Sequence, residues 1–186
     1  MNLYIKNMVS NRCKLIVKSE LQKFGLHYTL VELGQVEIME TLTIGQLHML
    51  NTALKHSGLA LIDDKKSMLI EKTKIIIIDL VHYSEKRLKV NFSDYLSETL
   101  NHDYTYLANI FSENQGTTIE HFFLNHKIER VKELLIYDDL NITEIADKMH
   151  YSSVAHLSNQ FKRMSGLTPS QYKHLSSKPR KALENV

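Results

Sequence analysis

The clearest pattern along this chain is a set of apolar stripes at helical spacing in its second half. Val154, Leu157 and Phe161 recur at positions i, i+3 and i+7, which puts them on one face of a helix. The preceding segment 143–149 also carries apolar residues on one helical face, and the polar run 150–153 interrupts the pattern. The sequence therefore predicts a short helix, a tight turn and a second amphipathic helix.

This pattern occurs twice, with an offset of 50 residues and no gap. The alignment pairs segment 92–96 with 142–146, 107–111 with 157–161, Gly116 with Gly166, and Thr118 with Thr168. Two copies of one supersecondary unit are therefore predicted. The residues between them, 118–136, carry a broad apolar face and are predicted to form one long helix that spaces the two copies.

Capping residues are predicted for both copies. Ser93 and Thr143, each followed by an acid, are expected to start the first helix of their copy. Ser152 or Ser153 is expected to start the second helix of the second copy, and Gly166 to end it. At 168–169, a threonine followed by proline indicates a further helix.

A short helix, a turn and a second helix make a helix-turn-helix, whose second helix can enter the major groove of DNA. In the second copy the outward face presents a cap serine, an alanine that can contact a thymine methyl, and amide or basic side chains suited to base edges or phosphates. The first copy presents an uncharged set. The candidate DNA-binding residues are Thr105, Tyr106, Asn109, Ser153, Ala155, His156, Asn159, Lys162, Arg163 and Lys173.

The N-terminal third has a different hydrophobic pattern, which predicts strands as well as helices. Segments 3–9, 27–33, 35–39 and 59–62 are predicted to be strands, and 13–24 and 43–55 to be helices. The resulting order, βαββαβ, is that of a ferredoxin-like fold. A further helix over about 64–86 is expected to lead into the second half, so the predicted class is α+β. The predicted domains are 1–63, a connecting helix and linker at 64–89, the double helix-turn-helix at 90–176 and a basic tail at 177–186.

Charge and composition narrow the function. Residues 91–147 have an acidic excess, whereas Lys148 to Leu183 contain seven basic residues and no acid, which suits contact with a polyanion. A solvated basic tail is the alternative reading of that stretch. The lone Cys13 excludes an internal disulfide framework. No signal peptide or membrane-spanning run is recognised, so a cytoplasmic protein without membrane contact is expected.

Segment 125–175 resembles the signature of the AraC/XylS family of transcriptional regulators. The features that carry the resemblance are segment 132–135 in the spacer helix, the pair Ile145-Ala146, the turn aromatic Tyr151, the pair at 161–162, Gly166, and Thr168-Pro169 through Tyr172. The resemblance covers about residues 90–176 and implies base contacts by Thr105, Asn109, His156 and Asn159. The sequence departs from the family pattern in three places: His150 replaces a glycine, Leu157 a phenylalanine, and Lys127-Ile128 an arginine-leucine pair.

The loop Met8 to Cys13 resembles the Met-x-Cys-x-x-Cys loop of heavy-metal-associated domains, placed between the first strand and the first helix. Ser10 stands where the first cysteine would be, and a hydroxyl is a poor ligand for soft metals. A degenerate domain used for dimerisation or sensing is therefore favoured. Cys13 remains a weak metal candidate, through a site shared by two chains, and a candidate reactive thiol.

No phosphate-binding glycine loop, nucleophile elbow or HExxH motif is present, so an enzyme is not expected. The predicted function is sequence-specific DNA binding that regulates transcription, without a cofactor. The expected partners are double-stranded DNA and RNA polymerase or other transcription machinery, with a homodimer through the N-terminal domain left open. The rival readings are a metal chaperone and a protein–protein adaptor.

Overall fold

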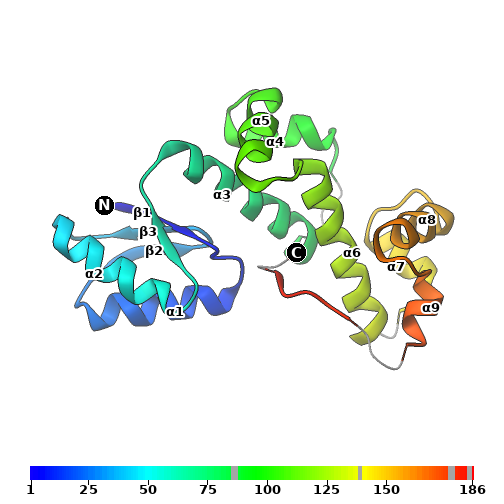
Figure 1. Cartoon of the computed structure of the whole chain (residues 1–186), viewed down its shortest axis with the longest axis horizontal. Coiled ribbons are helices and arrows are strands. Elements are labelled where there is room, and N and C mark those ends of the chain that lie inside the picture. Colours follow the sequence, from blue (N-terminus) through cyan, green and yellow to red (C-terminus); the bar gives the residue numbers. More distant parts are fainter. Residues whose placement is uncertain (85–87, 138–139, 176–178, 184–185) are drawn as a thin grey trace. The chain divides into compact units, whose positions relative to one another are not determined.

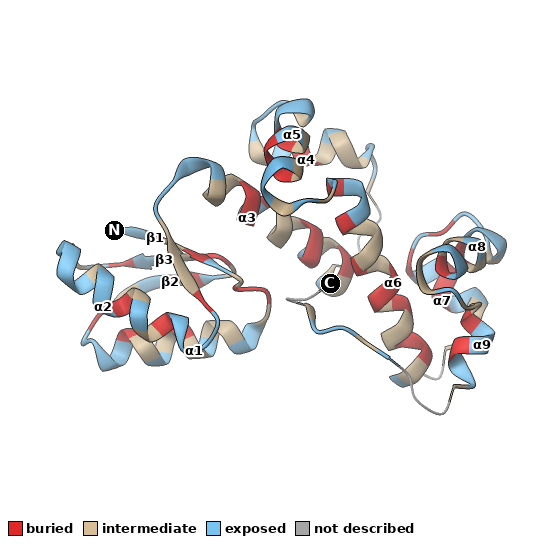
Figure 2. Cartoon of the chain, viewed as in Figure 1, coloured by how far each residue is buried: buried red, intermediate tan, exposed pale blue. Residues whose placement is uncertain are grey.

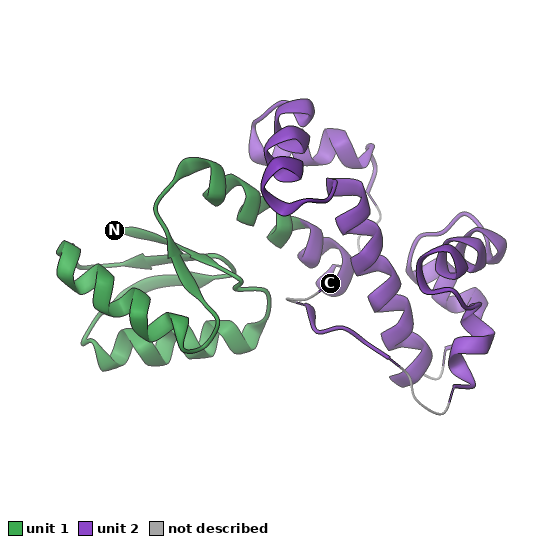
Figure 3. Cartoon of the chain, in the orientation of Figure 1, with its two compact units in different colours: residues 1–76 green, residues 77–186 purple. Residues whose placement is uncertain are grey.

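The computed structural model describes residues 1–84, 88–137, 140–175, 179–183 and 186 (Figure 1). The chain forms two compact units, Met1–Ile76 and Ile77–Val186 (Figure 3). A four-stranded sheet lies in the N-terminal unit, and the regular elements described in the C-terminal unit are helices. The α+β class predicted from the sequence is therefore confirmed.

The N-terminal unit has the element order that the sequence predicts. Its elements are β1 (Asn2–Lys6), α1 (Asn11–Lys23), β2 (Tyr28–Glu32), β3 (Gln35–Ile38), α2 (Ile44–Lys55) and β4 (Ala60–Ile62). The strand order is β2-β3-β1-β4 and every neighbouring pair is antiparallel. Leu3 lies opposite Val36, and Ile5 opposite Leu61, which fixes the register of the central strand.

Alternate strand residues point into one core with α1 and α2. Leu3 and Ile5 of β1 pack with Val17 of α1 and Leu50 of α2, all at most 5% exposed. This is the pattern of a sheet with one face covered by amphipathic helices. The turn between β2 and β3 needs glycine at position 34, because its φ is +71° and an added Cβ would lie 2.1 Å from Ile75 Cδ1.

The helix after β4 belongs largely to the N-terminal unit. α3 (Lys65–Ile78) is tied to the residue directly after β1, since the backbone N–H of Asn7 donates to Glu71 at 3.1 Å. The unit therefore runs to Ile76, beyond the boundary at 63 that the sequence indicates. The helix predicted over about 64–86 is confirmed as far as Tyr83: a π-helical turn, η1 (Asp79–Tyr83), continues α3 directly, and Ser84 is extended. Residues 85–87 of the predicted linker lie outside the described residues.

The C-terminal unit realises the sequence repeat in three dimensions. Its helices are α4 (Phe92–Leu100), α5 (Tyr104–Gln115), α6 (Ile119–Tyr137), α7 (Ile142–Lys148), α8 (Val154–Ser165) and α9 (Pro169–Lys173). The first residues of α4 and α7, of α5 and α8, and of α6 and α9 are each 50 positions apart. Both second helices end at a left-handed glycine, Gly116 or Gly166.

The first helix of each repeat copy begins earlier than the sequence predicts. α4 and α7 begin after Asn91 and Asn141, so Ser93 and Thr143 are not the N-caps. Asn141 is the better cap because its side-chain oxygen accepts the backbone N–H groups of both Thr143 and Glu144. Glu144 in turn accepts the N–H of Asn141, which completes a capping box.

The spacer helix α6 forms one side of the core of the C-terminal unit. Buried residues recur along it (Figure 2), and Ile128, Val131 and Leu135 pack in one cluster with Leu157 and Phe161 of α8. Both α8 residues are fully buried, as the apolar stripe predicts. Among the described residues, no helix is long and apolar enough to cross a membrane.

Candidate nucleic-acid interface

The second helix of each repeat is held by a side-chain cap. Asp103 caps α5 by accepting the backbone N–H of Tyr106 at 3.2 Å, and Ser153 caps α8 by accepting that of His156 at 3.1 Å. Of the two serines predicted as candidates for the start of α8, Ser152 and Ser153, the structure has Ser153 as the N-cap. These caps fix where each helix starts, so the two helices present equivalent positions to solvent.

All of the predicted DNA-binding side chains are exposed. They fall into one group on α5 and a second group on and around α8, and no buried position is among them: Thr105, Tyr106 and Asn109; Ser153, Ala155, His156, Asn159, Lys162 and Arg163; and Lys173 of α9. Leu107, Ile110 and Phe111 of α5 and Leu157 and Phe161 of α8 lie on the opposite, buried faces. Each helix thus exposes a polar face and is held in the core by an apolar face.

The turn before α8 is fixed by Tyr151, a residue that carries the family resemblance. Its hydroxyl donates to the side-chain oxygen of Gln160 at 2.6 Å, and its ring meets His156 edge-on at 5.2 Å between centroids. Burial raises the pKa of Tyr151 above that of a free phenol. Ser152 Oγ also lies 3.1 Å from His156 Nδ1, so the imidazole of His156 is held from two sides.

Lys127 of α6 joins the spacer helix to this turn. Its Nζ lies 4.0 Å from the centroid of the Tyr151 ring, within cation–π range. Burial lowers the pKa of Lys127 to about 8. The sequence singled out Lys127 only as a departure from the family pattern, and no local signal indicated its contact with Tyr151.

His150 occupies a backbone conformation that explains why the family pattern has glycine there. Its φ is +56°, in the left-handed region that side chains with a Cβ adopt at a cost. In the first copy the left-handed residue is Asn101, at φ +53°, one position later in the repeat. The turn can therefore be built without glycine, and the departure at His150 leaves the helix-turn-helix geometry intact.

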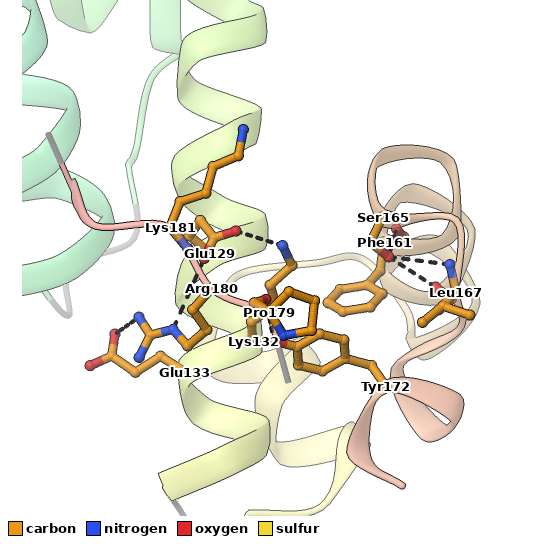
Figure 4. A network of polar contacts seen from close by, with 10 residues as sticks. All are labelled: Glu129, Lys132, Glu133, Phe161, Ser165, Leu167, Tyr172, Pro179, Arg180 and Lys181. Atoms are coloured by element: carbon orange, nitrogen blue, oxygen red, sulfur yellow. Dashed lines mark hydrogen bonds and ion pairs between the residues drawn. The ribbon is translucent and has the colours of Figure 1, made fainter. Parts of the chain in front are cut away.

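The described part of the predicted basic tail contacts α6 and Tyr172. The Arg180 side chain lies between Glu129 and Glu133 of α6, at 4.0 and 3.8 Å, and the backbone N–H of Lys181 donates to Glu129 at 3.1 Å. Pro179 O accepts the hydroxyl of Tyr172 (Figure 4). Arg180 is therefore committed to α6 by its acidic neighbours. Residues 177, 178, 184 and 185 of the predicted tail lie outside the described residues.

The thiol of Cys13 lies in the first turn of α1, half-buried. Its Sγ is 3.4 Å from Ser10 Oγ and 3.8 Å from the backbone oxygen of Asn7. Within the described ranges, no group of three or more His, Cys, Asp or Glu side chains is arranged to hold a metal ion. Cys13 therefore has a serine and a backbone carbonyl as its polar neighbours.

Comparison with known proteins addresses the repeated unit directly. Residues 96–174 match the family model described as a helix-turn-helix domain. These residues form a helix-turn-helix domain. The match includes α5, α6, α7, α8 and α9, and it supports the resemblance to the AraC/XylS family.

Two curated relatives of the helix-turn-helix domain are described as HTH-type transcriptional regulators. An uncharacterized regulator of Staphylococcus aureus (strain MSSA476) is 26% identical over 147 residues, 79% of this chain and 18% of the relative. YtdP of Bacillus subtilis (strain 168) is 26% identical over 98 residues, 52% of this chain and 12% of the relative. The chain therefore spans less than a fifth of the length of either relative. The first match is longer than the C-terminal unit, so it also includes residues of the N-terminal unit.

A solved structure shares the fold of the helix-turn-helix domain. The C-terminal domain of AraT, a response regulator from Geobacillus stearothermophilus, superposes with a TM-score of 0.51 at 24% identity, covering 64% of this chain and 97% of that domain. The domain match and the descriptions of the named relatives therefore agree on a helix-turn-helix domain in this chain.

Proposed function

We propose that this chain regulates transcription by binding a specific DNA sequence, with α5 and α8 reading two adjacent segments of the major groove. The observation that carries the proposal is the structural repeat. Two helices begin 50 residues apart, each capped by a side chain, anchored by a buried stripe and exposing polar residues at equivalent positions. A capped, exposed helix after a tight turn is the part of a helix-turn-helix that enters the groove.

The side chains divide by chemistry into base readers and phosphate contacts. Asn159 and Asn109 carry amides that can pair with an adenine edge, while His156 and Thr105 lie beside them as further readers. The basic residues that would hold phosphates are Lys162, Arg163 and Lys173. Tyr106, Ser153 and Ala155 complete the proposed surface.

The spacer helix gives one chain the means to hold both readers. α6 has 19 residues, and at a rise of about 1.5 Å per residue it extends about 28 Å. Neighbouring major-groove segments on one side of DNA are about 34 Å apart. A rigid element of this length lets a single domain address two segments without a second copy of the chain.

Asn159→Ala tests the assignment of base reading to α8. We expect cognate binding to weaken by about 1–3 kcal/mol, because one bidentate amide–adenine contact is lost, with little change on random duplex. Quantitative titration of both duplexes measures the difference. The matched control is Asn114→Ala, which removes an exposed amide near the end of α5, outside the proposed surface. Equal losses on cognate and random DNA would defeat the assignment of Asn159.

The remaining partners follow from this role. We propose that the chain acts in the cytoplasm together with the transcription machinery and not as an enzyme. The N-terminal unit is proposed to be a ferredoxin-like domain, which its βαββαβ order and the strand order β2-β3-β1-β4 support. A homodimer through this unit stays a proposal. A helix-turn-helix domain used only for protein contacts is the alternative, and it predicts no affinity for duplex DNA.

A further inference from the structure

The two helix-turn-helix units carry opposite charge. Residues 91–120, the first unit, contain five acids and neither lysine nor arginine, and all five acids are exposed: Asp94, Glu98, Asp103, Glu113 and Glu120. Residues 141–170, the second unit, contain two acids and three basic residues, all exposed: Glu144 and Asp147; Lys148, Lys162 and Arg163. The repeat is thus conserved in shape and reversed in charge.

The difference in charge is found at individual equivalent positions of the repeat. Arg163, near the end of α8, corresponds to Glu113 on α5, and Lys162 corresponds to Ser112. Lys148, at the end of α7, corresponds to Glu98 on α4. Because the helices of the two copies start at equivalent positions, these pairs occupy the same place in their units. Where the second unit offers a cation, the first offers a carboxylate or a hydroxyl.

This difference matters because phosphate contacts supply most of the affinity of a protein for DNA. Each phosphate neutralised by a lysine or arginine adds about 0.9 to the slope of log K against log salt, whereas a carboxylate near the backbone repels it. The first unit can read base edges through Thr105 and Asn109, but its described side chains include no cation to anchor it. Its acids Asp103 and Glu120 are also structural, since they accept hydrogen bonds from Tyr106 N–H and Tyr104 hydroxyl.

We propose that the second unit alone anchors this chain to the DNA backbone and that the first unit is a conditional reader, which engages its segment only after the second unit has bound. The inference rests on the proposed DNA-binding function. It assigns affinity and salt dependence to Lys162 and Arg163 of the second unit, together with Lys173 at the end of α9, directly after it. The first unit discriminates between sequences through its uncharged side chains. Its carboxylates repel the DNA phosphates, which weakens its binding.

The matched pair Arg163 and Glu113 tests this division in the whole chain. Binding of a selected duplex and of a random duplex is titrated at several salt concentrations for Arg163→Ala, Glu113→Ala and Glu113→Arg. We expect Arg163→Ala to weaken binding to both duplexes. The magnitude of the slope of log K against log salt should fall by about 1. Glu113→Ala should keep the slope and bind at least as tightly as the parent. Glu113→Arg should bind both duplexes several-fold more tightly and raise the slope by about 1.

Randomising one contact block at a time gives an independent readout. The block read by α8 is the one at which Asn159→Ala loses discrimination. Randomising it should reduce binding to the level of random duplex, while randomising the other block should leave binding at least tenfold above that level. Equal losses from the two blocks, or a fall in slope with Glu113→Ala equal to that with Arg163→Ala, would overturn the division of roles. Absence of any salt-sensitive duplex affinity in the unmodified chain would instead contradict the proposed function itself.

Discussion

Phe161→Ala is expected to lower the free energy of unfolding of the C-terminal unit by about 3–5 kcal/mol. Phe161 is fully buried, packs edge-on against Tyr172 with centroids 5.5 Å apart, and shares a cluster with Val131 and Leu135 of α6. Its loss opens a cavity between the spacer helix and α8. Denaturant unfolding measures the change, and duplex binding should fall because α8 is no longer held in place.

The control for this prediction lies two residues further along the same helix. Arg163 is exposed, so Arg163→Ala should change the free energy of unfolding by no more than about 0.5 kcal/mol while it weakens duplex binding. The two variants therefore separate folding from binding on one helix. A loss of less than about 1 kcal/mol in Phe161→Ala would show that α8 is not packed against α6 as described.

Glu129→Ala is expected to destabilise the C-terminal unit by about 2–4 kcal/mol, even though it removes a charged residue from a helix. Glu129 is 3% exposed and accepts hydrogen bonds from Lys132 Nζ at 2.5 Å and from the backbone N–H of Lys181 at 3.1 Å. Removing a buried carboxylate leaves its donors without a partner, which costs more than the pair contributes when intact. The expected value lies below that of a fully buried pair because the Lys132 side chain is 14% exposed.

Glu133 provides the matched control, because it is the same residue type one helical turn further along α6. Its side chain is 32% exposed, and it pairs with Arg130 at 2.8 Å and Arg180 at 3.8 Å. A partly exposed ion pair contributes little, so Glu133→Ala should cost at most about 1 kcal/mol by the same unfolding measurement. If both variants lose equal stability, the segment 179–181 does not depend on the buried carboxylate.

The helical half of the fold could be predicted from the sequence because its signals are local and repeated. The stripe Val154, Leu157 and Phe161 predicts which face of α8 is buried, and Gly166 and Thr168 mark the following boundaries by their capping chemistry. The exposed residues of α5 and α8 then follow by elimination. This is why every predicted DNA-binding side chain lies on the surface.

Other features could not be predicted, because they depend on contacts distant in sequence or on competition between neighbouring residues. Asn141 displaces Thr143 as the cap because its amide oxygen reaches two backbone N–H groups while Glu144 folds back. The association of α3 with the sheet rests on Glu71 reaching the backbone of Asn7, 64 positions away. No local signal predicts the placement of Arg180 beside Glu129 and Glu133. Charge alone indicates only that the basic stretch that contains Arg180 suits contact with a polyanion.

The difference in charge between the two helix-turn-helix units can be counted in the sequence, but only the structure shows which charged residues occupy equivalent positions. An acidic excess over 91–147 says little until Glu113 and Arg163 are known to occupy equivalent positions on two similarly capped helices. A regional imbalance then becomes a difference between two readers. The division of affinity and discrimination follows from that equivalence.

Selection of genomic DNA fragments by the purified chain, followed by titration of the best duplex at several salt concentrations, tests whether α5 and α8 both read DNA. We expect recovery of one discrete motif with two contact blocks about one helical turn apart, bound with an affinity that falls steeply as salt rises. No enriched sequence, and no salt-sensitive affinity for any duplex, would contradict it and would assign the double helix-turn-helix to protein contacts.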